Sequence, residues 1–251
     1  MLEETFTLFS GISEKKEKWL KKNGINSWED LILSGNKILN DKEFKKIKKE
    51  IKAAKKHLLS RDIKYFTRKL DSKNSWILYE NFKESACFLD IETTGLDEDS
   101  ELTILGISNY ERKYRVFVNG INFNPKKISK FLKKFKILIT FYGSRFDVPY
   151  IIRRYPELSE VLNKMAHIDL CFLGHRVGFK GGLKKIEKQI GIFRNIDIDG
   201  LTGFDAVRLW NKYIEGDKDA LITLIKYNRS DVVNLIDLIN IEIKMMKDFQ
   251  S

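Results

Sequence analysis

The fold of this chain is decided at residues 86–95, which read ACFLDIETTG. The first four residues are apolar and predict a buried strand, and Asp90 and Glu92 follow at its end. Residues two apart in a strand point to the same face, so both carboxylates project together. Adjacent carboxylates repel each other, and Mg²⁺ or Mn²⁺ is the kind of hard cation that offsets their charge. The alternative is a strand end with two solvated acids before a loop.

The remainder of the segment 85–251 alternates between short apolar runs and amphipathic stretches. Further strands are predicted at 102–108, 113–118, 136–141 and 166–169. Helices are predicted at 128–135, 147–155, 170–177, 183–190, 204–213 and 219–247. A meander of three strands, then alternating helix and strand, then helices, indicates an α/β fold in which helices flank a mixed sheet.

Two further acidic motifs follow the first along the chain. Asp147 lies in GSRFDVPY at 143–150, where it follows a buried strand and begins a helix. Asp231 ends YNRSD at 227–231, and Tyr227 lies four residues before it on the same helical face. Both motifs have a purely structural alternative. In that alternative Asp147 is a helix N-cap, and Tyr227 is a core residue with Asp231 at the edge of the core. The order of the motifs and the apolar runs around them favour one shared site.

The three motifs in this order resemble those of the DEDD exonuclease superfamily, whose members have an RNase H-like fold and include the DnaQ-like proofreading exonucleases. One branch carries His five residues before the last Asp, where this chain has Lys226; the other carries Tyr four residues before it, as here. The chain therefore resembles the tyrosine (DEDDy) branch. Within that branch, stretches 167–170 and 182–187 are similar to the YprB-like RNase H-like exonucleases. Tyr142 departs from the pattern, which has Asn at this position, so any substrate contact that this Asn makes in relatives would be altered here, whereas metal binding is expected to be kept.

The resemblance, over about residues 85–240, implies a two-metal-ion exonuclease that attacks 3′ ends. Two Mg²⁺ or Mn²⁺ ions would be held by Asp90, Glu92, Asp147 and Asp231. Tyr227 would orient the attacking water, because a phenol with a reference pKa of about 10 is a poor base at neutral pH. The residues expected beside the terminal nucleotide are Thr93, Thr94, Gly95 and Phe146.

Other polar residues have structural explanations at least as good as catalytic ones. Asp169 ends the last predicted strand and either approaches the metal ligands or caps the following helix. No catalytic role is assigned to His167 or His175. Asp197 and Asp199 are interpreted as loop acids.

The charge of the chain favours a polyanionic partner. Its formal net charge is +11 and its pI about 9.4, and basic proteins gain affinity for nucleic acids by neutralising phosphates. The expected substrate is single-stranded DNA or RNA, with DNA favoured; the sequence names no protein partner. A surface that is merely lysine-rich and solvated is the alternative.

Residues 1–84 are predicted to form a separate helical, basic domain. They hold 20 Lys and Arg against 13 Asp and Glu. The stretch 8–13 (LFSGIS) is similar to a helix-hairpin-helix segment, and a small helical bundle is the alternative. A predicted helix at 41–59 carries lysines that either follow a phosphate backbone or form a solvated face, among them Lys45, Lys49 and Lys52.

The two cysteines, Cys87 and Cys171, suggest no disulfide framework. Without a signal peptide or an apolar run of about 18 residues, a cytoplasmic protein away from the membrane is expected. The predicted function is thus a metal-dependent 3′→5′ exonuclease. The alternatives are a ribonuclease or structure-specific nuclease, a hydrolase of small nucleotides, and a non-catalytic nucleic-acid-binding module on an RNase H-like scaffold.

Overall fold

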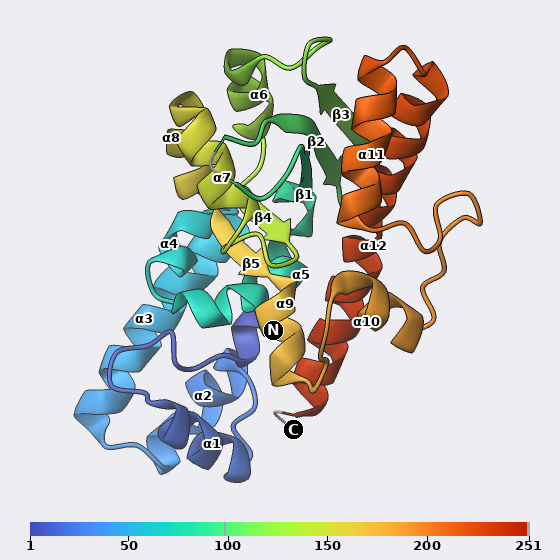
Figure 1. Cartoon of the computed structure of the whole chain (residues 1–251). Helices are drawn as coiled ribbons and strands as arrows, with labels where there is room; N and C mark the ends of the chain where they lie inside the picture. Colours follow the sequence, from blue (N-terminus) through green and yellow to red (C-terminus); the bar gives the residue numbers. More distant parts are fainter. Residues whose placement is uncertain (98, 250–251) are drawn as a thin grey trace. The chain divides into compact units, whose positions relative to one another are not determined.

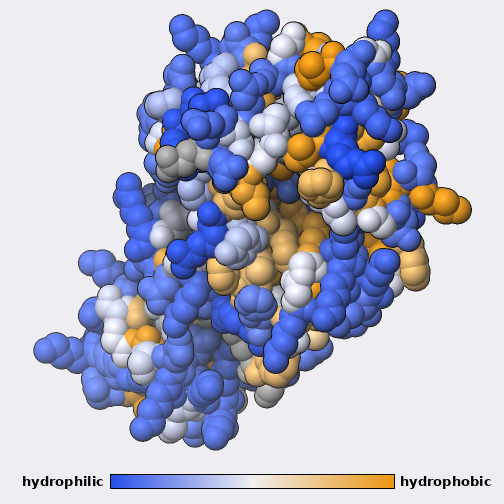
Figure 2. All heavy atoms as spheres, viewed as in Figure 1, coloured by the Kyte–Doolittle hydropathy of each residue, from blue (hydrophilic) through white to orange (hydrophobic). Residues whose placement is uncertain are grey.

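The computed structural model describes residues 1–97 and 99–249. The chain divides into two compact units, the second of which begins at Glu84 (Figure 1). Hydrophilic residues cover most of the face seen in Figure 2. Among the described helices, none has the length and apolar content needed to cross a bilayer.

The first unit is helical. Ser13 caps α1 by accepting a hydrogen bond from the Lys16 N–H at 3.3 Å, and Ser27 forms a capping box with Asp30 at the start of α2. The buried stripe of α3 consists of Ile47, Ile51 and Ala54, and its opposite face carries the lysines. The α-helices of this unit are α1 (Glu14–Lys22), α2 (Trp28–Ser34), α3 (Asp41–Leu59), α4 (Ile63–Thr67) and α5 (Tyr79–Phe82).

The second unit contains a mixed five-stranded sheet in the order β3-β2-β1-β4-β5. The first three strands form an antiparallel meander, whereas β4 pairs with β1 and β5 with β4 in parallel. The strands are β1 (Ala86–Thr93), β2 (Leu102–Asn109), β3 (Tyr114–Val118), β4 (Ile137–Thr140) and β5 (Ala166–Asp169). The predicted α/β fold with a mixed sheet is confirmed.

Helices cover both faces of this sheet (Figure 1). Cys87, Leu89 and Ile91 of β1 pack into a core with α6 (Pro125–Leu132), α7 (Asp147–Arg154) and α8 (Ser159–Asn163). The second core joins β2 and β3 to α11 (Gly203–Ile214) and α12 (Lys218–Asp248), through residues such as Ile104, Trp210 and Tyr227. Alternate residues of β1 therefore face opposite layers, and Asp90 and Glu92 face the α12 side.

The two remaining α-helices of this unit, α9 (Leu170–Arg176) and α10 (Leu183–Gln189), lie between β5 and α11 along the chain. Asp169 caps α9 by accepting from the Cys171 N–H, and Thr202 and Asp205 form a capping box on α11. These local signals are why the predicted helices agree with the observed ones to within a few residues.

Candidate active site

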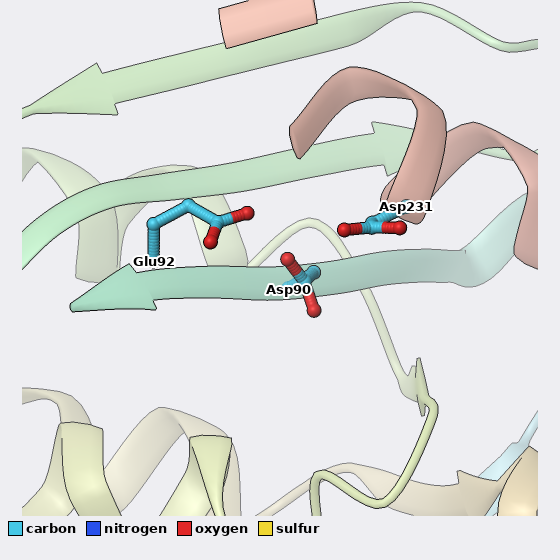
Figure 3. Close-up of side chains that lie close together, drawn as sticks. All are labelled: Asp90, Glu92 and Asp231. Carbon is cyan, nitrogen blue, oxygen red and sulfur yellow. The ribbon is translucent and has the colours of Figure 1, made fainter. Parts of the chain in front are cut away.

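Three carboxylates from two elements meet on the α12 side of the sheet (Figure 3). Asp90 and Glu92 come from β1, and Asp231 comes from α12, which lies across that strand. One carboxylate oxygen of each lies within 4.8 Å of the others. The strand alternation seen in the sequence explains the first pair, and the packing of α12 brings the third.

Asn228, one turn before Asp231, bridges the two strand carboxylates. Its Nδ2 donates to Asp90 Oδ2 at 2.8 Å and to Glu92 Oε1 at 3.3 Å, while its Oδ1 accepts from the Tyr114 hydroxyl at 2.7 Å. Gly106 pairs with Asp90 in the β1–β2 ladder, and a Cβ at this glycine would lie 1.9 Å from Asn228 Oδ1. The glycine thus makes room for the amide that holds both acids.

Asp147, the remaining predicted ligand, is buried at the start of α7 but is not one of the three acids that lie within 4.8 Å of one another. Its Oδ1 accepts a hydrogen bond from the Ile91 N–H, between the two strand acids, at 3.0 Å. The register of β1 with β4 extends only from Ala86 to Phe88, so this buried N–H needs a partner beyond the end of β4. Asp147 supplies it, which places its carboxylate directly beside β1.

Tyr227 is buried and has a cation as its neighbour. Its hydroxyl accepts a hydrogen bond from Lys184 Nζ at 2.7 Å, and the same Nζ lies 4.4 Å from the centre of the ring. Burial, followed by the charges of Asp231 and Glu92, raises the pKa of Tyr227 far above its ordinary value. The phenol therefore stays protonated and can act as a hydrogen-bond donor, not as a base.

Arg194 links Asp231 to a further buried acid. Its guanidinium donates to both oxygens of Glu187, at 2.7 and 2.8 Å, and to Asp231 Oδ1 at 2.5 Å. Glu187 also accepts from Asn234 Nδ2 at 2.9 Å. The network connects α10 and the loop after it to α12.

The acids of the site repel one another. Burial raises the pKa of Asp90 and Glu92 well above their ordinary values, and the negative charges of neighbouring acids raise them further. Burial also raises the pKa of Asp147 to about 7, and it raises that of Asp231 although Arg194 acts in the opposite direction. Buried carboxylates with raised pKa values are stabilised when a positive charge offsets their negative charges. A hard divalent cation such as Mg²⁺ or Mn²⁺, which prefers oxygen ligands, fits this group.

The turn after β1 is held by its own hydrogen bonds. Thr93 donates through Oγ1 to the Gly95 carbonyl at 2.6 Å, and Thr94 Oγ1 accepts from the Glu101 N–H at 2.9 Å. Phe146 precedes α7 and packs partly buried against the core, 5.9 Å from Tyr150 between ring centres. The contacts of these residues with a substrate stay a prediction, as does phosphate binding by the exposed Lys45, Lys49 and Lys52.

Asp169 has a structural role, the second of the two predicted alternatives. It accepts from the backbone N–H groups of Tyr142 at 2.8 Å and Ser144 at 2.9 Å, besides capping α9. Tyr142 has φ 61°, in the left-handed region that Asn and Gly adopt more readily than Tyr. The Asn expected there is thus suited to the backbone conformation, whatever it contacts in a substrate.

The remaining candidates pair with neighbours. His167 lies 2.8 Å from Thr140 Oγ1, and its burial lowers its pKa. Asp197 and Asp199 form ion pairs with Lys226 and Lys188.

Sequence reasoning missed four residues of the site. Asn228 was within reach, because it lies inside the YNRSD motif. Lys184 and Glu187 of α10 lie in the stretch 182–187 that carries the resemblance, but no role was assigned to them. Nothing in the local sequence indicates Arg194, which reaches the site from the loop after α10.

Comparison of the chain with known proteins identifies its family. Among curated proteins, no relative matches the chain. A similar solved structure is the family B DNA polymerase from the hyperthermophilic archaeon Pyrobaculum calidifontis, with a TM-score of 0.46 and 17% identity over 59% of this chain. The match covers 23% of the polymerase chain. The model of the RNase_H superfamily matches residues 87–242, which is more than half of the chain. On this match the chain belongs to the RNase_H superfamily.

Proposed function

We propose that this protein is a metal-dependent 3′→5′ exonuclease that hydrolyses phosphodiester bonds of single-stranded nucleic acid, with DNA favoured over RNA. The observation that carries the proposal is the convergence of Asp90, Glu92 and Asp231 within 4.8 Å in a domain of the RNase_H superfamily. The resemblance of the motifs to the tyrosine branch of the DEDD exonucleases supports the reaction and its polarity.

Asp90, Glu92, Asp147 and Asp231 would hold two Mg²⁺ or Mn²⁺ ions. When bound, these ions supply Lewis-acid activation of water and stabilise the charge that develops on the phosphate and the leaving 3′ oxygen. Asn228 keeps the strand carboxylates in place through its two hydrogen bonds.

Tyr227 would orient the attacking water. Its hydroxyl oxygen accepts from Lys184, so its own proton is free to be donated to that water. The raised pKa of Tyr227 keeps this proton in place at neutral pH. In this arrangement Lys184 fixes the direction of the hydroxyl.

The net charge of +11 supports a nucleic-acid substrate, because a polyanion is drawn to a basic protein and releases counterions on binding. The exposed lysines of α3 in the first unit, including Lys45, Lys49 and Lys52, are the proposed contacts with the phosphate backbone.

An assay with end-labelled single-stranded DNA, single-stranded RNA and duplex DNA tests the proposal. The wild type should shorten single strands from the 3′ end with Mg²⁺ or Mn²⁺ and stop when EDTA is added. Asp90→Asn and Asp231→Asn should abolish cleavage. Asp219→Asn, which changes an exposed acid of the same helix α12, should leave it intact. Binding of a single strand without cleavage at any metal concentration would refute catalysis and favour the non-catalytic module.

A further inference from the structure

Arg194 is the most completely enclosed cation near the acids of the site. Its side chain is 3% exposed, and that of Glu187, its main partner, is 2% exposed. Removing a guanidinium from water is costly unless its charge is balanced and its donors are used. Three hydrogen bonds, two to Glu187 and one to Asp231, balance its charge and engage Nε and Nη2.

Glu187 holds the guanidinium in one orientation. The bidentate contact fixes the plane of Arg194, because both Nε and Nη2 are engaged. Glu187 is itself tied to Asn234, which lies one turn after Asp231 on α12. The second proton of Nη2 is thereby aimed at Asp231 Oδ1.

We propose that Arg194 is a positioning residue for the metal ligand Asp231. By occupying Oδ1 it fixes the carboxylate plane and leaves Oδ2, which has no hydrogen bond from any of the described residues, as the oxygen for the cation. The inference rests on the proposed metal centre and adds to it the residue that sets the geometry of its helical ligand.

A direct contact between Arg194 and a substrate phosphate does not fit the geometry. The one nitrogen of Arg194 without a partner among the described residues, Nη1, is fully buried, so a phosphate oxygen cannot reach it in this conformation. Arg194 acts through Asp231 instead.

Competition between Arg194 and the metal is also disfavoured. A lone arginine would repel a divalent cation, but the buried carboxylate of Glu187 lies 2.7 Å from Arg194 Nε and offsets its charge. The gain in metal affinity from orienting Asp231 is therefore expected to exceed the loss from repulsion between Arg194 and the cation. Removal of Arg194 should weaken metal binding.

The affinity for Mn²⁺ alone, measured by titration calorimetry and by the paramagnetic resonance of free Mn²⁺, tests this inference without substrate. Arg194→Met should weaken binding by about tenfold or more, as loss of a residue that orients a metal ligand does. The double variant Glu187→Gln with Arg194→Met removes one charge of each sign and should weaken binding similarly. Arg194→Lys keeps the charge but not the fork and should not restore affinity.

Thermal unfolding in EDTA shows which variants are folded. If the double variant is unfolded, the Mn²⁺ affinity of Arg194→Lys tests the inference in its place. Affinity within twofold of the wild type in the double variant or in Arg194→Lys would overturn the inference, as would tighter binding in either. A wild type that binds Mn²⁺ but cuts no nucleic acid would refute the exonuclease and leave the role of Arg194 standing. A wild type that binds no Mn²⁺ would overturn both.

Discussion

Replacing Asp90 by Asn should stabilise the metal-free protein while it abolishes cleavage. Asp90 lies within 4.8 Å of both Glu92 and Asp231, measured between carboxylate oxygens. At that separation and an effective dielectric constant of about 20, two unit charges repel by about 3.5 kcal/mol. The acids relieve part of this by binding protons, which is what the raised pKa of Asp90 expresses. We therefore expect a net gain of about 2 kcal/mol in the free energy of unfolding.

The substitution keeps the local contacts. Asn228 Nδ2 donates to Asp90 Oδ2 at 2.8 Å, and the amide oxygen of an introduced Asn can accept the same hydrogen bond. The change is also nearly isosteric, so it creates no cavity. What remains is the loss of one negative charge from a crowded group of acids.

Urea unfolding followed by circular dichroism, at about pH 8 where the acids are most charged, measures the effect. In EDTA the variant should unfold at higher urea than the wild type. With millimolar Mg²⁺ the order should reverse, because only the wild type gains the full free energy of metal binding. Asp219→Asn, on the exposed face of α12, should change neither midpoint. If Asp90→Asn lowers the stability in EDTA, the acids do not repel as argued and the reasoning fails.

Three further outcomes follow. Burial raises the pKa of Asp147 to about 7, so the folded protein binds more protons than the unfolded chain between about pH 4 and 7. In EDTA the free energy of unfolding should therefore fall by up to about 4 kcal/mol as pH rises through this window. An increase in that free energy over the same window, measured by urea unfolding, would contradict the prediction. Gly106→Ala should displace Asn228, lower the free energy of unfolding by about 1.5–3 kcal/mol and remove most of the activity. Gly203→Ala is the control, because a Cβ at Gly203 meets nothing within 4 Å. Equal urea midpoints for the two variants would refute this prediction. Lys184→Met should lower kcat about tenfold with little change in KM, because it removes the hydrogen bond to Tyr227, which is worth about 1.4 kcal/mol. In steady-state kinetics, an effect confined to KM would instead assign Lys184 to substrate binding.

Signals within a few residues were enough to predict much of the fold and part of the site. The period of two in β1 places Asp90 and Glu92 on one face, and the structure has them there. Asp169, at the end of β5, caps α9 as one of its two predicted roles, because it satisfies an N–H group only two residues away. The resemblance carried by the acidic motifs implied an RNase H-like domain, and the family match agrees with it.

The tertiary structure decided which of these residues meet. Asp231 reaches the strand acids because α12 packs across β1, and Asp147 turns to an N–H that β4 leaves unpaired. Arg194 and Gly106 have roles only through contacts with α12, which no local pattern encodes. Periodicity and capping act over one or two turns of the chain, whereas the electrostatics of a buried site depend on which distant side chains share the space. The sequence alone therefore determined most of the elements and the candidate acids, and the packing of α12 determined which of these acids meet.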